Sequence, residues 1–197
     1  MKDTWYGDRR DLVKCGTLVH LARSEQIRTV IQVAFLRKGE RPPLQTDQGE
    51  VEIAQEVWQY LRNLSLIRGL GEKTGLDIVV FDREFDPERR REYIREVADF
   101  LKSRPGRKVV LLDPDTGIEP KKAGPKHVKV IEIQELWEVL SQGDWLVLYQ
   151  HAFRETNWRE TTRERFAEAC GVKEEEVKTF EAGEIAWDVA FFAANRR

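Results

Sequence analysis

Residues that could do chemistry lie directly after three short apolar segments of the sequence. Asp113 and Asp115 follow one segment, Asp82 follows another, and His151 ends a third. Carboxylates accept hydrogen bonds from amines or bind hard cations, and a histidine exchanges protons near neutral pH. If the segments are neighbouring strands of an open α/β sheet, these side chains meet at its carboxyl edge, where such sheets bind ligands. The pattern therefore predicts a functional site at that edge.

The same acids also suit a structural role. Residues 113–117, Asp-Pro-Asp-Thr-Gly, have the composition of a type I turn that Asp113 would cap. Asp82 either binds a ligand or caps the loop that follows it. The other histidines, His20 in a helix-like segment and His127 in a lysine-rich loop, are expected to be structural or exposed. The sequence leaves both interpretations of the acids open.

The elements that must position these residues alternate between strand-like and helix-like segments. Short apolar runs rich in β-branched residues predict buried strands at 29–36, 76–82, 108–113 and 145–151, and two more strands within 176–194. Apolar residues at helical spacing predict helices at about 9–24, 51–61, 86–101, 133–141 and 158–170. This alternation implies a mainly parallel sheet between two layers of helices.

The same patterns predict local details. The inner face of the first helix is expected to consist of Leu12, Cys15, Leu18, Val19 and Ala22. Proline and glycine predict a loop at 37–50 and a glycine-bearing connection at 67–75. The last two strands are expected to join at Ala182 and Gly183, and one face of the second strand is expected to present Ile185, Trp187, Val189 and Phe191.

The predicted fold class is α/β. In more detail, we expect a three-layer, Rossmann-like, methyltransferase-type fold whose mostly parallel sheet ends in a C-terminal antiparallel hairpin. With 197 residues, the chain is expected to form a single α/β domain, residues 1–197.

The composition argues against several classes of protein. No apolar run approaches the roughly 20 residues of a membrane span, and no export signal is present, so a cytoplasmic protein without membrane partners is expected. A formal net charge of −2 argues against a strongly basic polyelectrolyte. Cys15 and Cys170 lack metal-ligand spacing and are expected to be free thiols. The motifs of dinucleotide sites, P-loops, serine hydrolases and zincins are absent from the sequence.

A set of motifs resembles one family of enzymes. A Gly-Asp-x-x-Asp-x-x-Lys segment begins at Gly7, a later strand runs into Asp-Pro at 113–114, and an aromatic strand ends at His151. This combination resembles the bacterial adenine-N6 methyltransferases that modify large-subunit ribosomal RNA. The resemblance covers scattered parts of residues 6–36 and 108–151.

The resemblance implies an activity, a cofactor and roles for individual residues. Asp113 would accept a hydrogen bond from the target amine, and the carbonyl of Pro114 would take the second amine hydrogen. The amine nitrogen would then attack the methyl group of S-adenosylmethionine. The cofactor would be bound by Asp8, Lys14 and Asp82, with Lys14 near its carboxylate.

The sequence departs from the family at three places, one of which is Cys15, where the family carries a histidine. Asp115 and Thr116 replace the second proline and the aromatic residue on which a flipped base would stack. Residues 32–43 lack an acidic, glycine-rich turn. The leading hypothesis is a divergent methyltransferase-like protein that acts on a nucleobase or another amine. Its proposed catalytic residues are Asp113, Pro114, Asp115 and His151, and it needs no metal ligand.

Two other classes of function stay open. Asp82, Asp113 and Asp115 could bind Mg²⁺ in a nuclease or phosphodiesterase, with His151 assisting proton transfer. Alternatively, the chain is a non-catalytic module that binds nucleic acid or protein through an aromatic and basic face. That face would comprise Trp5, Tyr6, Arg9, Arg10, Lys121, Lys122 and Lys126. Nucleic acid is thus a candidate partner, and no oligomeric state follows from the sequence.

Overall fold

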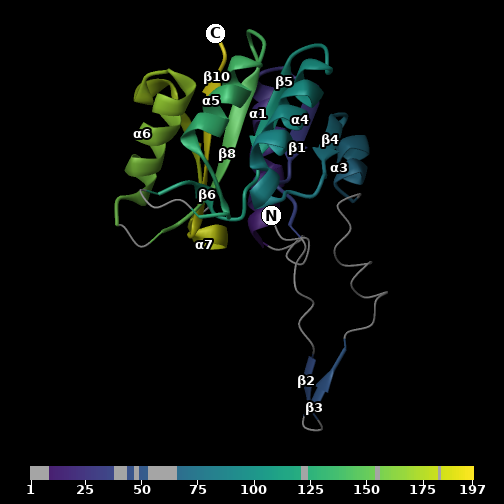
Figure 1. The fold of residues 1–197 in the computed structure, drawn as a ribbon. Helices are drawn as coiled ribbons and strands as arrows, with labels where there is room; N and C mark the ends of the chain where they lie inside the picture. Colours follow the sequence, from purple (N-terminus) through teal and green to yellow (C-terminus); the bar gives the residue numbers. More distant parts are fainter. Residues whose placement is uncertain are drawn as a thin grey trace.

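A six-stranded sheet forms the centre of the computed structural model (Figure 1). The structure describes residues 9–37, 44–46, 49–52, 66–120, 124–153, 156–181 and 183–197. The strands of the sheet are β1 (Thr29–Val33), β4 (Asp77–Phe81), β5 (Lys108–Leu112), β8 (Trp145–His151), β9 (Lys178–Phe180) and β10 (Val189–Asn195). Their order across the sheet is β4-β1-β5-β8-β10-β9. The strands predicted from the sequence are therefore confirmed, and most are shorter than predicted.

The direction of β10 defines the class of fold. β1 pairs in parallel with β4 and β5, and β5 pairs in parallel with β8. β10 is antiparallel to both of its neighbours, β8 and β9, so the last strand of the chain is inserted between two earlier ones. A mostly parallel sheet with its final strand inserted in this way is a Rossmann-like, methyltransferase-type α/β fold, as the sequence predicts.

Helices cover both faces of the sheet and complete the three layers. One face is covered by α1 (Arg9–Ser24), α3 (Leu66–Thr74) and α7 (Gly183–Ala186). The other is covered by α4 (Arg90–Lys102), α5 (Val130–Glu138) and α6 (Trp158–Cys170). The shorter elements are β2 (Leu44–Thr46), β3 (Gly49–Val51), η2 (Pro87–Arg89), β6 (Gly117–Ile118), β7 (His127–Val128) and η3 (Glu174–Glu176). None of the described helices is long and apolar enough to cross a membrane.

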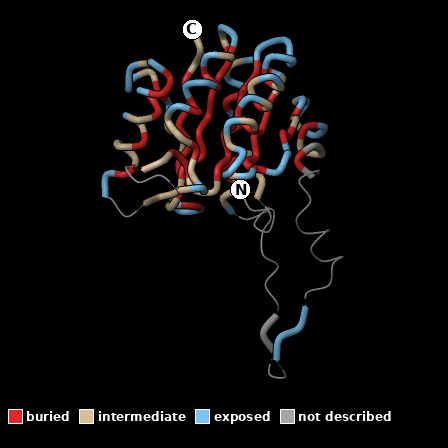
Figure 2. Tube along the Cα trace, viewed as in Figure 1, coloured by how far each residue is buried: buried red, intermediate tan, exposed pale blue. Residues whose placement is uncertain are grey.

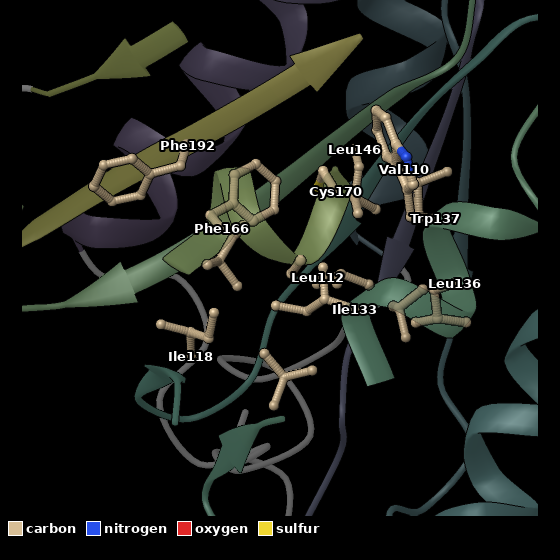
Figure 3. Packing of buried hydrophobic residues seen from close by; sticks show 14 of the residues in the cluster. Val110, Leu112, Ile118, Ile133, Leu136, Trp137, Leu146, Phe166, Cys170 and Phe192 are labelled. Atoms are coloured by element: carbon tan, nitrogen blue, oxygen red, sulfur yellow. The ribbon is translucent and has the colours of Figure 1, made fainter. Parts of the chain in front are cut away.

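Two hydrophobic clusters, one on each face of the sheet, hold the layers together, and the strands between them are buried (Figure 2). Side chains alternate between the two faces along a strand. Val110 and Leu112 of β5 therefore join the cluster under α4, α5 and α6, whereas Val109 and Leu111 join the cluster under α1 and α3. Figure 3 shows part of the first cluster, in which Phe166 of α6 belongs to the same core. Burial on both faces explains why the strands are continuous apolar runs in the sequence.

The buried face of α1 differs from the predicted one. Leu12 is 64% exposed, and Cys15 and Val19 are only partly buried. The buried residues of α1 are Asp11, Val13, Lys14, Thr17, Leu18, Leu21 and Ala22. Hydropathy misplaces this face because Asp11 and Lys14 are buried as paired charges, and charged residues are rarely buried otherwise.

The predicted loop at 37–50 and the predicted helix at 51–61 are wrong where they are described. Part of this region forms an antiparallel pair of short strands, β2 and β3, separate from the main sheet. Val51 therefore belongs to a strand and not to a helix. The rest of the predicted helix, from residue 53 onward, lies outside the described residues.

Two connections also differ from the prediction. Residues 66–74 form helix α3 despite two glycines, because each glycine costs only about 1 kcal/mol in a helix and the packing of Ile67 and Leu70 on the sheet offsets that cost. The last two strands are joined through α7 and not by a tight turn. Ile185 and Trp187 consequently lie before β10 and are exposed.

Candidate functional site

The carboxyl edge of the sheet contains a topological switch point between β1 and β5. The chain passes from β1 to α3 on one face, and from β5 to α5 on the other. Neighbouring strands whose connections leave in opposite directions open a crevice at their carboxyl ends, and open α/β sheets bind ligands there. The first turns of α1 lie at the same edge, because Lys14 of α1 contacts Asp113 directly after β5.

A buried set of polar residues lies at this switch point: Asp11, Lys14, Gln32 and Asp113, termed the Lys14 cluster below. Lys14 Nζ donates hydrogen bonds to Asp113 Oδ2 over 2.8 Å and to Asp11 Oδ1 over 2.6 Å. Gln32 Nε2 donates to the same Asp113 oxygen over 2.7 Å. None of the four residues is more than 8% exposed. Helix α1, strand β1 and the end of β5 are thereby joined at one point.

The charge of Lys14 depends on its two carboxylate partners. Burial acts to lower the pKa of Lys14, but the charges and hydrogen bonds of Asp113 and Asp11 outweigh burial, and the pKa is raised above its ordinary value. Lys14 is therefore a charged ammonium between two carboxylates.

Gln32 also carries an acceptor that lacks a donor. Its Oε1 is buried and accepts no hydrogen bond within the described part of the chain. Most buried polar atoms in proteins are hydrogen-bonded, so an exception requires a structural or functional reason. The bond from Nε2 to Asp113 fixes the amide, and Oε1 is therefore held in one orientation.

A second group of polar residues continues from the Lys14 cluster along β8. The Lys14 ammonium lies 5.2 Å from the centre of the Tyr149 ring, and the Tyr149 hydroxyl is 2.7 Å from His151 Nε2. His151 Nδ1 is 4.0 Å from Asp188 Oδ2, which accepts a hydrogen bond from Arg10 Nε over 3.1 Å. A hydroxyl, an imidazole and a carboxylate in this order can pass a proton from the hydroxyl to the imidazole, whose positive charge the carboxylate stabilises.

The charge of Asp188 depends on Arg10. Burial acts to raise the pKa of Asp188, but the hydrogen bond and charge of Arg10 outweigh it and hold the pKa below its usual range. Asp188 is therefore a carboxylate at neutral pH and can stabilise a protonated His151.

An ion pair links the two sides of the switch point. Arg37 Nη1 donates to Asp115 Oδ2 over 3.1 Å, so the segment after β1 is tied to the segment after β5. Phe35, close by in sequence, has a φ of 45°. A non-glycine residue in this left-handed conformation costs about 1–3 kcal/mol, and such strain concentrates at functional sites. The left-handed backbone at Phe35 thus lies between β1 and Arg37, beside the candidate site.

Aromatic side chains fill the neighbouring part of the edge, beyond β1 and β4. Phe35, Phe85 and Tyr93 contact one another with ring centroids 5.0–5.4 Å apart. The backbone N–H of Phe85 also donates to the Leu36 carbonyl over 2.7 Å, which joins the segments that follow the two strands. These contacts pack the segments that follow β1 and β4 against each other at this edge.

The structure brings most of the predicted site residues to one edge. Lys14, Asp113 and Asp115 lie at the carboxyl ends of β1 and β5, and Pro114, between the two acids in the sequence, is buried. His151 lies on β8, the neighbour of β5, and contacts Tyr149.

Two predicted site residues are not part of this group. Asp82 follows β4 and is exposed, and β1 separates it from Asp113 by two strand spacings, about 10 Å. Asp8 lies outside the described residues.

Sequence reasoning missed two residues of the site. Gln32 could have been identified from the sequence, since a glutamine inside a strand buried on both faces needs a polar partner. Asp188 could not, because its contact with Arg10 joins residues 178 positions apart and exists only in the folded chain.

The alternatives gain no support from the described residues. Among those residues, no group of three or more His, Cys, Asp and Glu side chains could hold a metal ion. Asp113 and Asp115 face Lys14 and Arg37. Of the proposed basic face, Arg10 is paired with Asp188, whereas Trp5, Tyr6, Lys121 and Lys122 lie outside the described residues.

The strand order defines a methyltransferase-type α/β fold, and a buried polar cluster lies at its switch point. No protein-family model and no curated protein matches the sequence. Among solved structures, the chain is similar to a "putative methyltransferase" from Thermobifida fusca, with 13% identity, a TM-score of 0.47, and coverage of 96% of this chain and 80% of that one. It is also similar to a DUF574 family protein from Streptomyces avermitilis, with 12% identity, a TM-score of 0.44, and coverage of 96% and 82%. Both TM-scores are below 0.5, so the fold is assigned from the strand order and not from these two similarities.

Proposed function

We propose that the chain is a divergent methyltransferase-like enzyme that acts on an amine, such as the exocyclic amine of a nucleobase, in the crevice between β1 and β5. The observation that carries the proposal is the Lys14 cluster. It places two carboxylates beside the switch point of this fold, together with Gln32 Oε1, an acceptor that finds no donor among the described residues. An amine brings hydrogen-bond donors, and a methylated sulfonium brings a positive charge.

S-adenosylmethionine is the methyl donor that this class of fold implies. The residues present fit the cationic end of such a molecule, because carboxylates lie at the switch point and Gln32 Oε1 finds no donor among the described residues. Lys14 is already held by Asp11 and Asp113, so its proposed part is to fix Asp113 and not to bind the cofactor's carboxylate directly. Asp8 and Asp82 stay proposed cofactor contacts. When bound, the cofactor supplies a methyl group that its sulfonium already activates.

The residues of the chain bind and orient the amine. In this proposal Asp113 and the Pro114 carbonyl accept the two amine hydrogens, and Gln32 Oε1 provides an acceptor beside Asp113. These hydrogen bonds direct the nitrogen lone pair toward the methyl group, and alignment of this kind supplies much of the rate of a bimolecular transfer. Asp115 contributes by holding Arg37, which fixes the far wall of the crevice.

The proton that the amine loses needs an acceptor. Methyl transfer would form an N–C bond while the S–C bond of the sulfonium breaks and a neutral thioether leaves, so the positive charge would pass to the nitrogen. The nitrogen would then return to neutrality by releasing a proton. In this proposal the Tyr149 hydroxyl passes that proton to His151, and Asp188 stabilises the imidazolium that results.

Calorimetry tests this proposal on the full chain. S-adenosylmethionine is expected to bind the wild type, and Asp113→Asn is expected to weaken binding by about tenfold or more, since a lost charge contact costs about 1.5–3 kcal/mol. Asp77→Asn is the control. It makes the same change at an exposed residue at the start of β4, on the amino edge of the sheet, and this variant should bind S-adenosylmethionine like the wild type. If a folded wild type binds no S-adenosylmethionine, the proposal is wrong. Mg²⁺ binding that Asp113→Asn abolishes would point instead to a metal-dependent nuclease.

A further inference from the structure

A cavity of about 580 Å³ lies at the amino edge of the sheet, opposite the candidate site. Arg107 precedes β5, Trp145 begins β8, Lys178 begins β9, and the antiparallel β10 ends here at Asn195. The volume lies within the roughly 300–1,000 Å³ typical of small-molecule pockets. None of the groups assigned to the candidate site lines this cavity.

Two arginines of the cavity face no carboxylate. Within the described residues, no acid lies within ion-pair distance of Arg107 or Arg196. By contrast, the neighbouring Lys178 and Arg197 are paired with Glu25 and Glu176. Arg107 Nε donates to the Gly143 carbonyl over 3.2 Å, and the Arg196 guanidinium lies 5.3 Å from the centre of the Trp137 ring. Both guanidinium groups therefore keep donors for a ligand.

Gly143 brings the two arginines together. Its carbonyl accepts from the Arg107 side chain, and its N–H donates to the Arg196 carbonyl. Gly143 has a φ of 86°, and a Cβ at this position would lie 2.8 Å from Arg107 Nε. A glycine is thus needed here for the backbone turn and for the close approach of Arg107.

Two tryptophans form part of the wall. Trp137 and Trp145 are each 4% exposed, and Lys178 Nζ lies 4.4 Å from the centre of the Trp145 ring. The indole N–H of Trp145 is buried and finds no acceptor in the described part of the chain. The wall therefore combines cations with a buried donor, and donors of this kind favour an anionic or acceptor-rich ligand.

We propose that this amino-edge cavity binds a small phosphomonoester. Planar guanidinium groups present paired N–H donors that match the oxygens of a phosphate. The cavity is also lined by Glu25, Glu175 and Glu176. A long polyanion such as RNA would be repelled by these acids, whereas a single phosphate can contact the arginines without contacting them. The proposed ligand is therefore a metabolite-sized phosphate, of the size of a mononucleotide or a sugar phosphate.

The site is tested with ribose 5-phosphate, glucose 6-phosphate, ribose and inorganic phosphate, each titrated into the full chain by calorimetry. The two phosphomonoesters are expected to bind, and ribose, which lacks a phosphate, is not. The variant Arg107→Gln/Arg196→Gln should weaken ribose 5-phosphate binding by about tenfold or more, because it removes charge-assisted hydrogen bonds. Arg196→Lys keeps the positive charge but loses the paired N–H donors of the guanidinium, and should weaken binding less than the double variant does.

Two controls make the outcome decisive. Arg104→Gln removes an arginine that is exposed and stacked on Phe100, as Arg196 is stacked on Trp137, and should leave binding unchanged. Asp113→Asn should also leave it unchanged, so a failure of the proposed methyl transfer and a failure of this site are distinguishable. Ribose 5-phosphate that does not bind the folded wild type, or that binds the double variant equally well, would overturn the proposal, as would equal binding of ribose. Single-stranded RNA that competes for the cavity would overturn the choice of a small ligand.

Discussion

The Lys14 ammonium donates to Asp113 Oδ2 over 2.8 Å although 99 positions separate the two residues in the sequence. The contact is buried, and it joins the first described helix to the end of the central strand β5. Removing one member of a buried ion pair leaves the other charge without compensation, which costs far more than losing a surface pair. The stability of the fold and the arrangement of the candidate site therefore depend on the same contact.

Replacing Lys14 with methionine should destabilise the protein strongly. The change leaves Asp11 and Asp113 buried without their ammonium, and a loss of about 3–5 kcal/mol in the free energy of unfolding is expected. Urea denaturation of Lys14→Met measures this loss. Lys73→Met removes an exposed lysine near the end of α3 and should change the free energy by less than about 0.5 kcal/mol. Equal effects of the two substitutions would show that the cluster does not stabilise the fold.

The pH dependence of stability should reveal the contact between Arg10 and Asp188. The pKa of Asp188 is lower in the folded chain than its ordinary value of 3.8, so the contact stabilises the fold above that pH. This contribution is lost as pH falls through the lowered pKa. The free-energy difference between the wild type and Asp188→Asn should therefore be constant near neutrality and shrink below pH 3.8. A difference that stays constant in acid would contradict the assignment.

Gly117 should tolerate no side chain. Its φ is 105°, and a Cβ would lie 2.2 Å from Gln150 Oε1, which accepts the Ile118 N–H and holds the turn after Asp113. Gly117→Ala is expected to cost more than about 1–3 kcal/mol, the usual cost of backbone strain alone. Gly16→Ala is the matched control, because no atom lies within 4 Å of its new Cβ in helix α1. That variant should instead gain about 0.5–1 kcal/mol. Thermal melts of both variants measure the contrast.

The two free cysteines should differ in reactivity. Burial raises the pKa of the Cys170 thiol, which is 3% exposed, so little reactive thiolate forms there at neutral pH. Cys15 also has a raised pKa from burial, but it is only partly buried. Alkylation of the native protein, followed by mass spectrometry, should label Cys15 slowly and Cys170 only after denaturation. Faster labelling of Cys170 in the native protein would contradict its buried position.

The sequence predicts the sheet better than it predicts the helix faces. The apolar run Val109–Leu112 identifies a strand buried on both faces, because such a strand has no exposed face and therefore no alternation of polar and apolar residues. The buried face of α1 could not be predicted from hydropathy, because Asp11 and Lys14 are charged residues. They are buried because Lys14 pairs with both Asp11 and Asp113 in the folded chain. The glycines of α3 favour a loop in the sequence, but the segment is a helix because its packing on the sheet overrides local propensity.

The candidate site was predictable in part. Acids at the ends of strands must meet at one edge, so Asp113, Asp115 and His151 could be placed there from the sequence. Which partner each finds depends on the order of strands in space. Asp82 is kept apart because β1 lies between β4 and β5, an order that no local pattern specifies.

The most direct test of the central claim maps where S-adenosylmethionine binds, through amide chemical shifts of the isotope-labelled full chain. The account predicts shifts concentrated at the carboxyl ends of β1 and β5, around Gln32 and Asp113, and at the first turns of α1, with the amino edge unaffected. Absence of shifts at saturating ligand, or shifts confined to the amino edge around Arg107 and Arg196, would contradict it.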